Sequence, residues 1–161
     1  MNVEKEYDIK SQACYRCGIT CHNNISEKNA DGSKGEFLAK FDYEPLNLLS
    51  TNIGVHDAGQ AARLIQLGDN YGMDAISLGV TISYALSYNE RHPQATILNG
   101  ATFGDFEKIR ELIIQAGEGK LPEIGKGSMC LSEKMGETSY AYHVKGLEIA
   151  AYQPETNPGY A

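Results

Sequence analysis

The closely spaced cysteines Cys14, Cys17 and Cys21 are the sequence feature that most constrains how this chain can fold. Thiolates crowded in this way hold zinc or an iron–sulfur cluster, each of which commonly takes four protein ligands. Cys130 supplies a fourth thiolate only if the fold brings it back, and nothing in the spacing decides that. His22 would complete a three-cysteine, one-histidine zinc site, although adjacent residues seldom bind one tetrahedral ion. We therefore expect a metal or cluster at this segment.

Two other interpretations of the cysteines, haem attachment and thiols that bind no metal, are weaker. Haem attachment uses Cys-x-x-Cys-His, whereas Cys17 and Cys21 are separated by one residue too many before His22. An oxidised pair or three free thiols is the reading that needs no metal at all. Because the chain begins with charged residues and no apolar segment, we expect neither a secretion signal nor a membrane anchor, and a cytoplasmic protein whose thiols stay reduced.

Length and charge limit the remaining classes. A chain of 161 residues is long enough for one domain with a sizeable core. Its formal net charge of −7, with scattered basic residues, argues against nucleic acid as the main partner. The apolar-leaning run Ala75 to Tyr88 is too short to span a bilayer and predicts a buried core helix instead.

Helical patterns dominate the middle of the sequence. From Asp57 the apolar residues recur at helical spacing until Gly72, and Asp74 then stands at the N-cap position of a second helix. Asp105 caps a third, which ends at Gly117. A short helix is expected near residues 124–127. The fold class predicted is therefore mainly α.

The other segments carry weaker signals. Residues 23–35 have the composition of an exposed loop, and residues 37–53, interrupted by Pro45, show no clean period. From Met129 onward the sequence is less regular, with Tyr140 to Val144 the best strand candidate and residues 153–160 a loop. Turn-rich sequence at one end, and a cysteine motif close to the other, lead us to expect a fragment that is incomplete at both ends.

Four motifs stand out along the sequence: Ala13 to His22, Tyr43-Glu44-Pro45, Asp69 to Asp74, and His143 to Glu148. Together and in this order they resemble the aldehyde ferredoxin oxidoreductase family. The resemblance implies an N-terminal β domain followed by two mostly helical domains. Residues 1–161 would be a fragment of the helical region, with a cluster-binding segment at 12–24, a first pterin motif at 69–74 and a His-Val-Lys-Gly segment at 143–146. The N-terminal β domain and the C-terminal part would be absent.

The same resemblance implies a tungsten- or molybdenum-pterin enzyme that oxidises aldehydes to carboxylic acids. Electrons would leave through a [4Fe-4S] cluster to ferredoxin or a partner subunit. Cys14, Cys17 and Cys21 match three of the cluster ligands, whereas the family's fourth comes from an Asp-x-x-Gly-Leu-Cys motif that this sequence lacks, and Cys130 does not stand in one. We therefore expect the 161 residues alone to be inactive, and activity to require the remaining domains or a companion chain.

The resemblance also assigns contacts to the cofactor and to the reacting atoms. Near the metal, Glu44 and His143 would move the protons that aldehyde oxidation releases. Without the resemblance each is an ordinary residue, a loop glutamate before proline and a hydrogen-bonded histidine. The implied pterin contacts are Asp69, Met73 (in place of the usual leucine), Asp74 and Lys145.

Two other classes of protein remain open from the sequence. A small iron–sulfur electron-transfer subunit would use the four cysteines and leave Glu44 and His143 without a role. A zinc-stabilised helical interaction module would use the three clustered cysteines with His22 or Cys130. The metal content distinguishes these from a tungsten or molybdenum enzyme.

Overall fold

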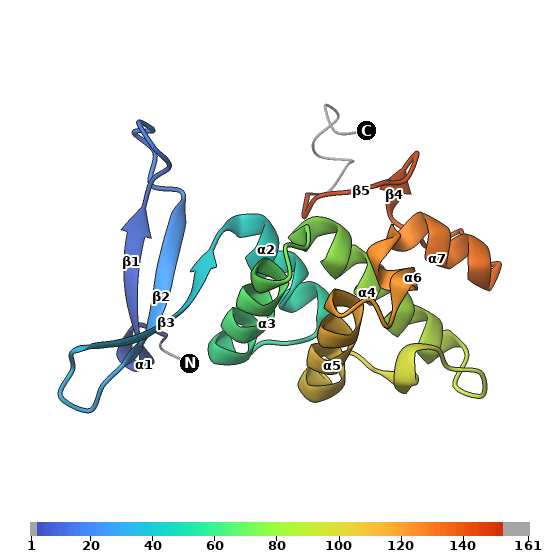
Figure 1. Ribbon diagram of the computed structural model, residues 1–161, viewed down its shortest axis with the longest axis horizontal. Coiled ribbons are helices and arrows are strands. Elements are labelled where there is room, and N and C mark those ends of the chain that lie inside the picture. The colour runs from blue at the N-terminus through green and yellow to red at the C-terminus, as the bar shows by residue number, and fades with distance from the viewer. Residues whose placement is uncertain (1–2, 153–161) are drawn as a thin grey trace.

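The chain is described by a computed structural model that covers residues 3–152. Figure 1 shows a three-stranded sheet at one end, a body of helices beside it, and a small hairpin over that body. The elements are α1 (Val3–Glu6), β1 (Tyr7–Gln12), β2 (His22–Lys28), β3 (Lys34–Phe41), α2 (Tyr43–Leu48), the 3-10 turn η1 (Thr51–Ile53), α3 (Ala58–Asn70), α4 (Ala75–Arg91), the 3-10 turn η2 (Leu98–Gly100), α5 (Phe106–Gly117), α6 (Pro122–Gly125), α7 (Gly127–Met135), β4 (His143–Val144) and β5 (Leu147–Glu148). At 47% helix, the prediction of a mainly helical chain is confirmed.

The three longest helices begin where the sequence predicts. In each case an aspartate side chain accepts a hydrogen bond from the backbone N–H three residues later, which pairs a group that the helix itself leaves unpaired. Asp57 caps α3 at 2.9 Å, Asp74 caps α4 at 2.8 Å and Asp105 caps α5 at 3.2 Å. These local contacts fix the boundaries on which the candidate site depends.

Helix α4 runs through the centre of the helical body. Its Ile82 and Leu86 are fully buried, as the prediction of a buried helix at residues 75–88 requires. The main core gathers side chains from α3, α4, α5, η1 and the sheet, the largest being Ile25, Ile53, Leu64, Ile65, Ile82, Leu86, Ile109, Leu112 and Ile113. One continuous core therefore connects the sheet to the helices.

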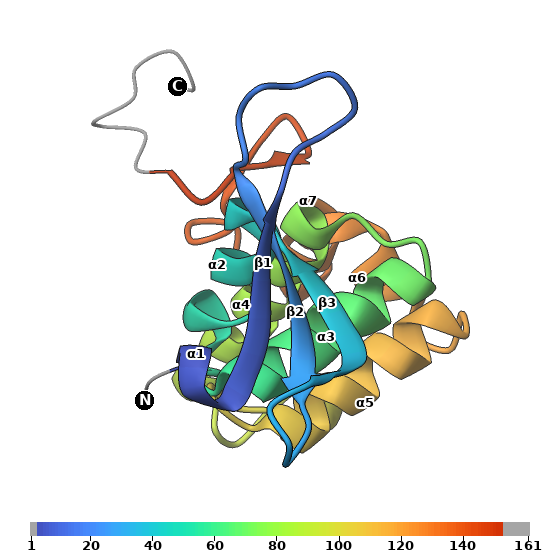
Figure 2. The same ribbon diagram turned by 90° about the vertical axis from the view of Figure 1, so that its left-hand side faces the viewer.

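The sheet corrects much of the predicted exposed loop at residues 23–35, of which only 29–33 form an exposed turn, and the first part of the irregular chain predicted at 37–53. Strands β1, β2 and β3 pair antiparallel in that order, with Tyr7 opposite Glu27 and Gln12 opposite His22. Figure 2 shows the sheet lying across one side of the helices. Strand β2 is polar along most of its length and its pairing with β3 is irregular, so no clean alternation marks it in the sequence. Its backbone is paired on both sides, by β1 and by β3.

Further departures lie in α2 and in the last third. Pro45 lies in the first turn of α2, where a missing N–H removes no helical hydrogen bond. Helix α7 replaces the irregular chain expected from Met129, and α6 begins at Pro122, ahead of the expected short helix. Of the strand candidate, only His143–Val144 is extended. The loop expected at residues 153–160 lies outside the described residues.

Candidate functional site

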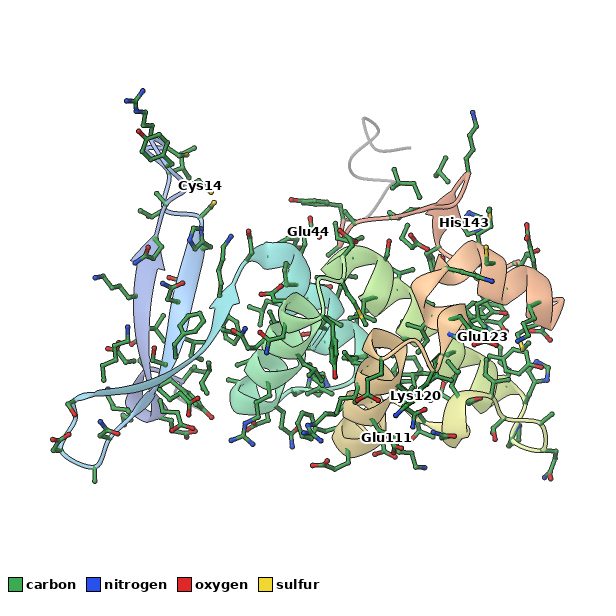
Figure 3. The ribbon with its side chains drawn as sticks, in the orientation of Figure 1. Cys14, Glu44, Glu111, Lys120, Glu123 and His143 are labelled. Atoms are coloured by element: carbon green, nitrogen blue, oxygen red, sulfur yellow. The ribbon has the colours of Figure 1, made fainter. Side chains whose placement is uncertain are left out.

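The three clustered cysteines lie on the loop that connects β1 to β2. All three are exposed free thiols, and Figure 3 shows Cys14 at the far end of the pair formed by β1 and β2. A backbone hydrogen bond of 3.0 Å from the Cys17 N–H to the Cys14 carbonyl closes a turn, with Arg16 at a φ of 59°. The cysteines are thus presented together on a short, exposed loop, with the donor chemistry that zinc and iron–sulfur clusters take.

The other two candidate ligands do not join this loop. Cys130 lies on α7, at the opposite end of the molecule from the β1–β2 loop (Figure 1). His22 begins β2 and is buried, whereas the adjacent Cys21 is exposed. Within residues 3–152, no group of three or more His, Cys, Asp or Glu side chains is arranged to hold a metal ion. Cys130 as fourth ligand is therefore wrong for this fold, and the loop would need to rearrange around a metal.

The junction between α3 and α4 forms the second candidate segment. Gly72, at a φ of 67°, ends α3, and its N–H donates to the Asp69 carbonyl at 3.0 Å. The Met73 N–H donates to the Gly68 carbonyl at 3.0 Å, and Met73 packs against the main core. Asp69 and Asp74 are exposed. The junction is therefore rigid in its backbone and presents two carboxylates to solvent.

The third segment is the hairpin of β4 and β5. Its turn residues, Lys145 and Gly146, have φ values of 53° and 87°, the left-handed pair that a two-residue hairpin needs. The Gly146 N–H donates to Nδ1 of His143 at 3.3 Å. This contact occupies Nδ1 and leaves Nε2 of the imidazole for another partner. Lys145 is exposed at the tip.

The second and third segments meet at one cavity of about 520 Å³. Gly72, Met73 and Asp74 line it from the helix junction, and Gly146 and Glu148 line it from the hairpin. Its remaining walls come from α4, the end of α5, and residues 124–127. Two motifs that are far apart in the sequence thus border the same space.

Glu44 lies in α2 and holds the segment that follows β5. Its Oε2 accepts from the Ala151 N–H at 2.9 Å, while the Tyr43 hydroxyl donates to the Ala151 carbonyl at 3.0 Å. Figure 3 shows Glu44 and His143 on the same side of the molecule. A mainly apolar cavity of about 300 Å³ is lined by Ala151 and by Tyr142, the neighbour of His143. A neighbour of His143 and a hydrogen-bond partner of Glu44 therefore border one cavity, whereas neither of these two side chains lines it.

Sequence reasoning assigned no role to Glu148, which is 8% exposed. Its Oε2 accepts from the Ser77 hydroxyl at 2.7 Å, and its Oε1 accepts from the N–H and the hydroxyl of Ser128 at 2.7 and 3.0 Å. Burial works to raise the pKa of this carboxyl, but the hydrogen bonds outweigh burial and hold the pKa below its usual range. The only sequence signal was its place in the His143 to Glu148 motif.

No helix within the described part of the chain is long and apolar enough to cross a membrane.

Comparison with known proteins places all of these segments in one family. The family described as "Aldehyde ferredoxin oxidoreductase, domains 2 & 3" matches residues 1–161. A tungsten-containing aldehyde ferredoxin oxidoreductase from Pyrococcus furiosus is 27% identical over 96% of this chain, and one from Pyrococcus abyssi is 30% identical over 96%. An aliphatic sulfonate oxidoreductase, WOR-like subunit, from Pyrococcus furiosus is 29% identical over 94%. The chain spans 26% of the length of each of these relatives.

Proposed function

The chain belongs to the aldehyde ferredoxin oxidoreductase family, and on that premise we propose that it forms part of a tungsten- or molybdenum-pterin enzyme. The whole enzyme would oxidise an aldehyde to a carboxylic acid and pass electrons through a [4Fe-4S] cluster to ferredoxin or an electron-transfer subunit. Since the chain spans about a quarter of the length of its relatives, it would act together with the remaining domains or a companion chain.

One observation carries the proposal. The cavity of about 520 Å³ is bordered both by the first pterin motif, at Gly72 to Asp74, and by the turn of the hairpin, at Gly146. A ligand edge in this cavity would meet the carboxylate of Asp74 at the helix junction, and Lys145 stands next to Gly146 in the hairpin turn. Such a donor and acceptor set suits a polar heterocycle that carries a phosphate.

Each segment contributes a separate binding role. The carboxylates of Asp69 and Asp74 would accept from ring N–H groups, and Asp74 retains a second oxygen because Oδ1 is used for the cap. Met73 would contact the pterin through its backbone, and the Lys145 ammonium would pair with a phosphate or ring oxygen of the pterin. Cys14, Cys17 and Cys21 would bind three irons of the cluster as thiolates, with the fourth ligand from outside this chain.

Proton handling would fall to Glu44 and His143. Oxidation of an aldehyde with water gives a carboxylic acid, two protons and two electrons, so the protons need acceptors beside the reacting carbon. When bound, the metal-pterin would take up the two electrons and the cluster would pass them on. His143 would take up or release a proton at Nε2, the ring nitrogen that the Gly146 contact leaves available. Glu44, fixed by the Ala151 N–H, would accept a released proton.

The proposal is tested on the full-length protein, purified without oxygen. We expect iron together with tungsten or molybdenum, and reduction of a viologen dye that depends on added aldehyde. His143→Ala should lower kcat by about 100-fold or more while the metal content stays unchanged, as expected for the loss of a proton-transfer group. Cys14→Ser should lower the iron content instead.

Other metal contents would contradict the proposal. Iron without tungsten or molybdenum would indicate an electron-transfer subunit, and zinc alone would indicate a structural module. Activity of residues 1–161 on their own would refute the statement that the remaining domains are required.

A further inference from the structure

The buried carboxylate of Glu148 joins three elements of the fold. Ser77 lies in the first turn of α4, which Asp74 caps, and Ser128 lies in the first turn of α7. Glu148 itself stands opposite His143 in the β4–β5 pair. Through its hydrogen bonds one side chain therefore connects the hairpin to the helix that begins at the pterin motif.

The β4–β5 hairpin is short and largely exposed. It consists of two residue pairs, His143 with Glu148 and Val144 with Leu147. Val144 and Leu147 are 52% and 75% exposed, so they bury little apolar surface. Isolated two-stranded hairpins are at best marginally stable in water. Glu148, the residue of the hairpin that is buried, therefore anchors it to α4 and α7, in addition to the contacts that Tyr43 and Glu44 make with Ala151 after β5.

The backbone at the start of α7 also allows its close contact with Glu148. Gly127 has a φ of 84°, and a Cβ added there would lie 2.5 Å from Oε1 of Glu148. Any side chain at residue 127 would displace the carboxylate. Glycine thus allows both the left-handed backbone and the close approach that lets Oε1 reach the Ser128 N–H.

We propose that Glu148 is a positioning residue that holds the β4–β5 hairpin, and with it His143 and Lys145, at a fixed spacing from Asp74. This rests on the proposed function, in which the hairpin and the pterin motif contact one cofactor. The buried carboxylate touches neither the substrate nor the reacting atoms in this role. Its effect is transmitted through the hairpin.

The geometry separates a conservative change from a disruptive one. In Glu148→Gln the amide oxygen can still accept from Ser128, and the amide nitrogen can donate to the Ser77 hydroxyl, which can turn to accept. In Glu148→Ala the Ser128 N–H and both serine hydroxyls lose their partner and the hairpin is released. Ser77→Ala removes one hydrogen bond and serves as a milder variant that keeps the other two contacts.

The experiment measures how fast the purified full-length holoprotein loses its tungsten or molybdenum to a chelator. Glu148→Ala should release metal about a hundredfold faster, since it loses three hydrogen bonds to a charged group and the loss of one corresponds to about tenfold. Glu148→Gln should stay within about threefold of the parent, and Ser77→Ala should fall between them. Glu133→Ala, an exposed glutamate on the same α7, is the matched control and should leave the release rate unchanged.

A second background separates positioning from general stability. Lys145→Met removes the charged contact between the hairpin and the cofactor, so adding Glu148→Ala should accelerate metal release little further. An equal acceleration in both backgrounds would overturn the proposal, because a purely structural residue acts independently of Lys145. A release rate unchanged by Glu148→Ala would overturn it as well.

Hydrogen exchange keeps the proposal testable even if the proposed function fails. A parent protein without tungsten or molybdenum would reject the function, and exchange at the Gly146 and Leu147 amides would then report the anchor alone. Faster exchange there in Glu148→Ala, but not in Glu148→Gln, supports positioning of the hairpin. Unchanged exchange in Glu148→Ala rejects it.

Discussion

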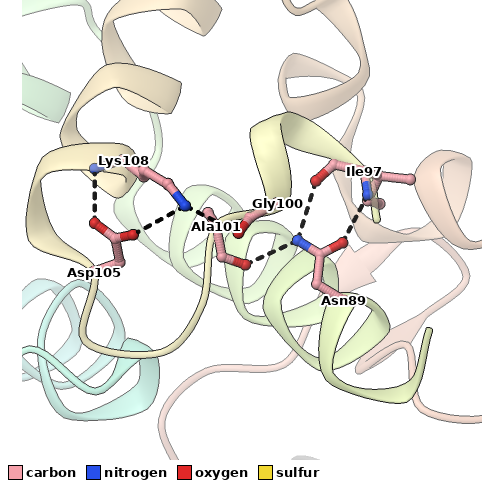
Figure 4. Close-up of polar contacts among 6 residues, drawn as sticks. All are labelled: Asn89, Ile97, Gly100, Ala101, Asp105 and Lys108. Carbon is pink, nitrogen blue, oxygen red and sulfur yellow. Dashed lines mark hydrogen bonds and ion pairs between the residues drawn. The ribbon is translucent and has the colours of Figure 1, made fainter. Parts of the chain in front are cut away.

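Asn89, near the end of α4, offers a quantitative test of how the helical body is held together. Its side chain is 3% exposed and makes three hydrogen bonds to the connection between α4 and α5 (Figure 4). Nδ2 donates to the carbonyls of Ile97 at 3.0 Å and Ala101 at 2.8 Å, and Oδ1 accepts from the Ile97 N–H at 2.7 Å. The asparagine thus ties this connection to α4.

The effect of Asn89→Ala on the free energy of unfolding follows from these contacts. Each hydrogen bond contributes about 1 kcal/mol net, so three contribute about 3 kcal/mol. Alanine recovers about 0.5 kcal/mol through its higher helix propensity. We expect a net loss of about 2.5 kcal/mol. Asn89→Asp should be no better, because its carboxylate would face the two carbonyl oxygens that now receive N–H groups.

The assay is urea unfolding, with hydrogen exchange at the Ile97 amide as a local readout. Asn70→Ala is the control, since Asn70 is exposed and accepts one hydrogen bond, from Gln66 at 2.8 Å. The control should change stability by less than about 0.5 kcal/mol. A loss below about 1 kcal/mol for Asn89→Ala, or one equal to the control, would refute the argument that this side chain holds the connection.

Three further outcomes are expected. Asp105→Ala should lower stability by about 1 kcal/mol through loss of the α5 cap, and Asp105→Ser should recover most of it in the same unfolding assay. Ile25→Ala should lower it by about 2–4 kcal/mol because Ile25 is fully buried in the main core, and a loss below about 1 kcal/mol would show that the sheet does not share that core. The Tyr140 hydroxyl, and then His92, lower the pKa of Glu137. Ionised Glu137 therefore stabilises the folded protein at pH values above the usual glutamate pKa, and this stabilisation is lost as the pH falls through the lowered pKa. The melting temperatures of Glu137→Gln and the parent should differ at neutral pH and converge in acid.

The parts of the fold that the sequence predicts are those fixed by local contacts. Asp57, Asp74 and Asp105 each bond to a backbone group three residues away, so a short window contains the whole signal. The sheet depends on contacts such as Tyr7 opposite Glu27, and the polar composition of β2 gives no alternation to recognise. Strands of this kind are specified by their neighbours, which the sequence pattern does not reveal.

The candidate site divides in the same way. The cysteine spacing and the Gly72 junction are local features, and both appear in the structure as a loop and a helix cap. The role of Glu148 depends on Ser77 and Ser128, which are far from it in the sequence. The sequence pattern of a glutamate among apolar neighbours does not distinguish a solvated side chain from a buried one, so only the fold identifies the role of Glu148.

The left-handed backbone at Lys145 makes this position informative about evolutionary history. With a φ of 53°, it suits asparagine, aspartate or glycine, and other side chains there cost about 1 kcal/mol or more. Drift without selection should therefore remove a lysine from the turn. If the proposed cofactor contact is right, relatives without that cofactor should carry asparagine or glycine here, and relatives that bind it should retain lysine despite its backbone cost.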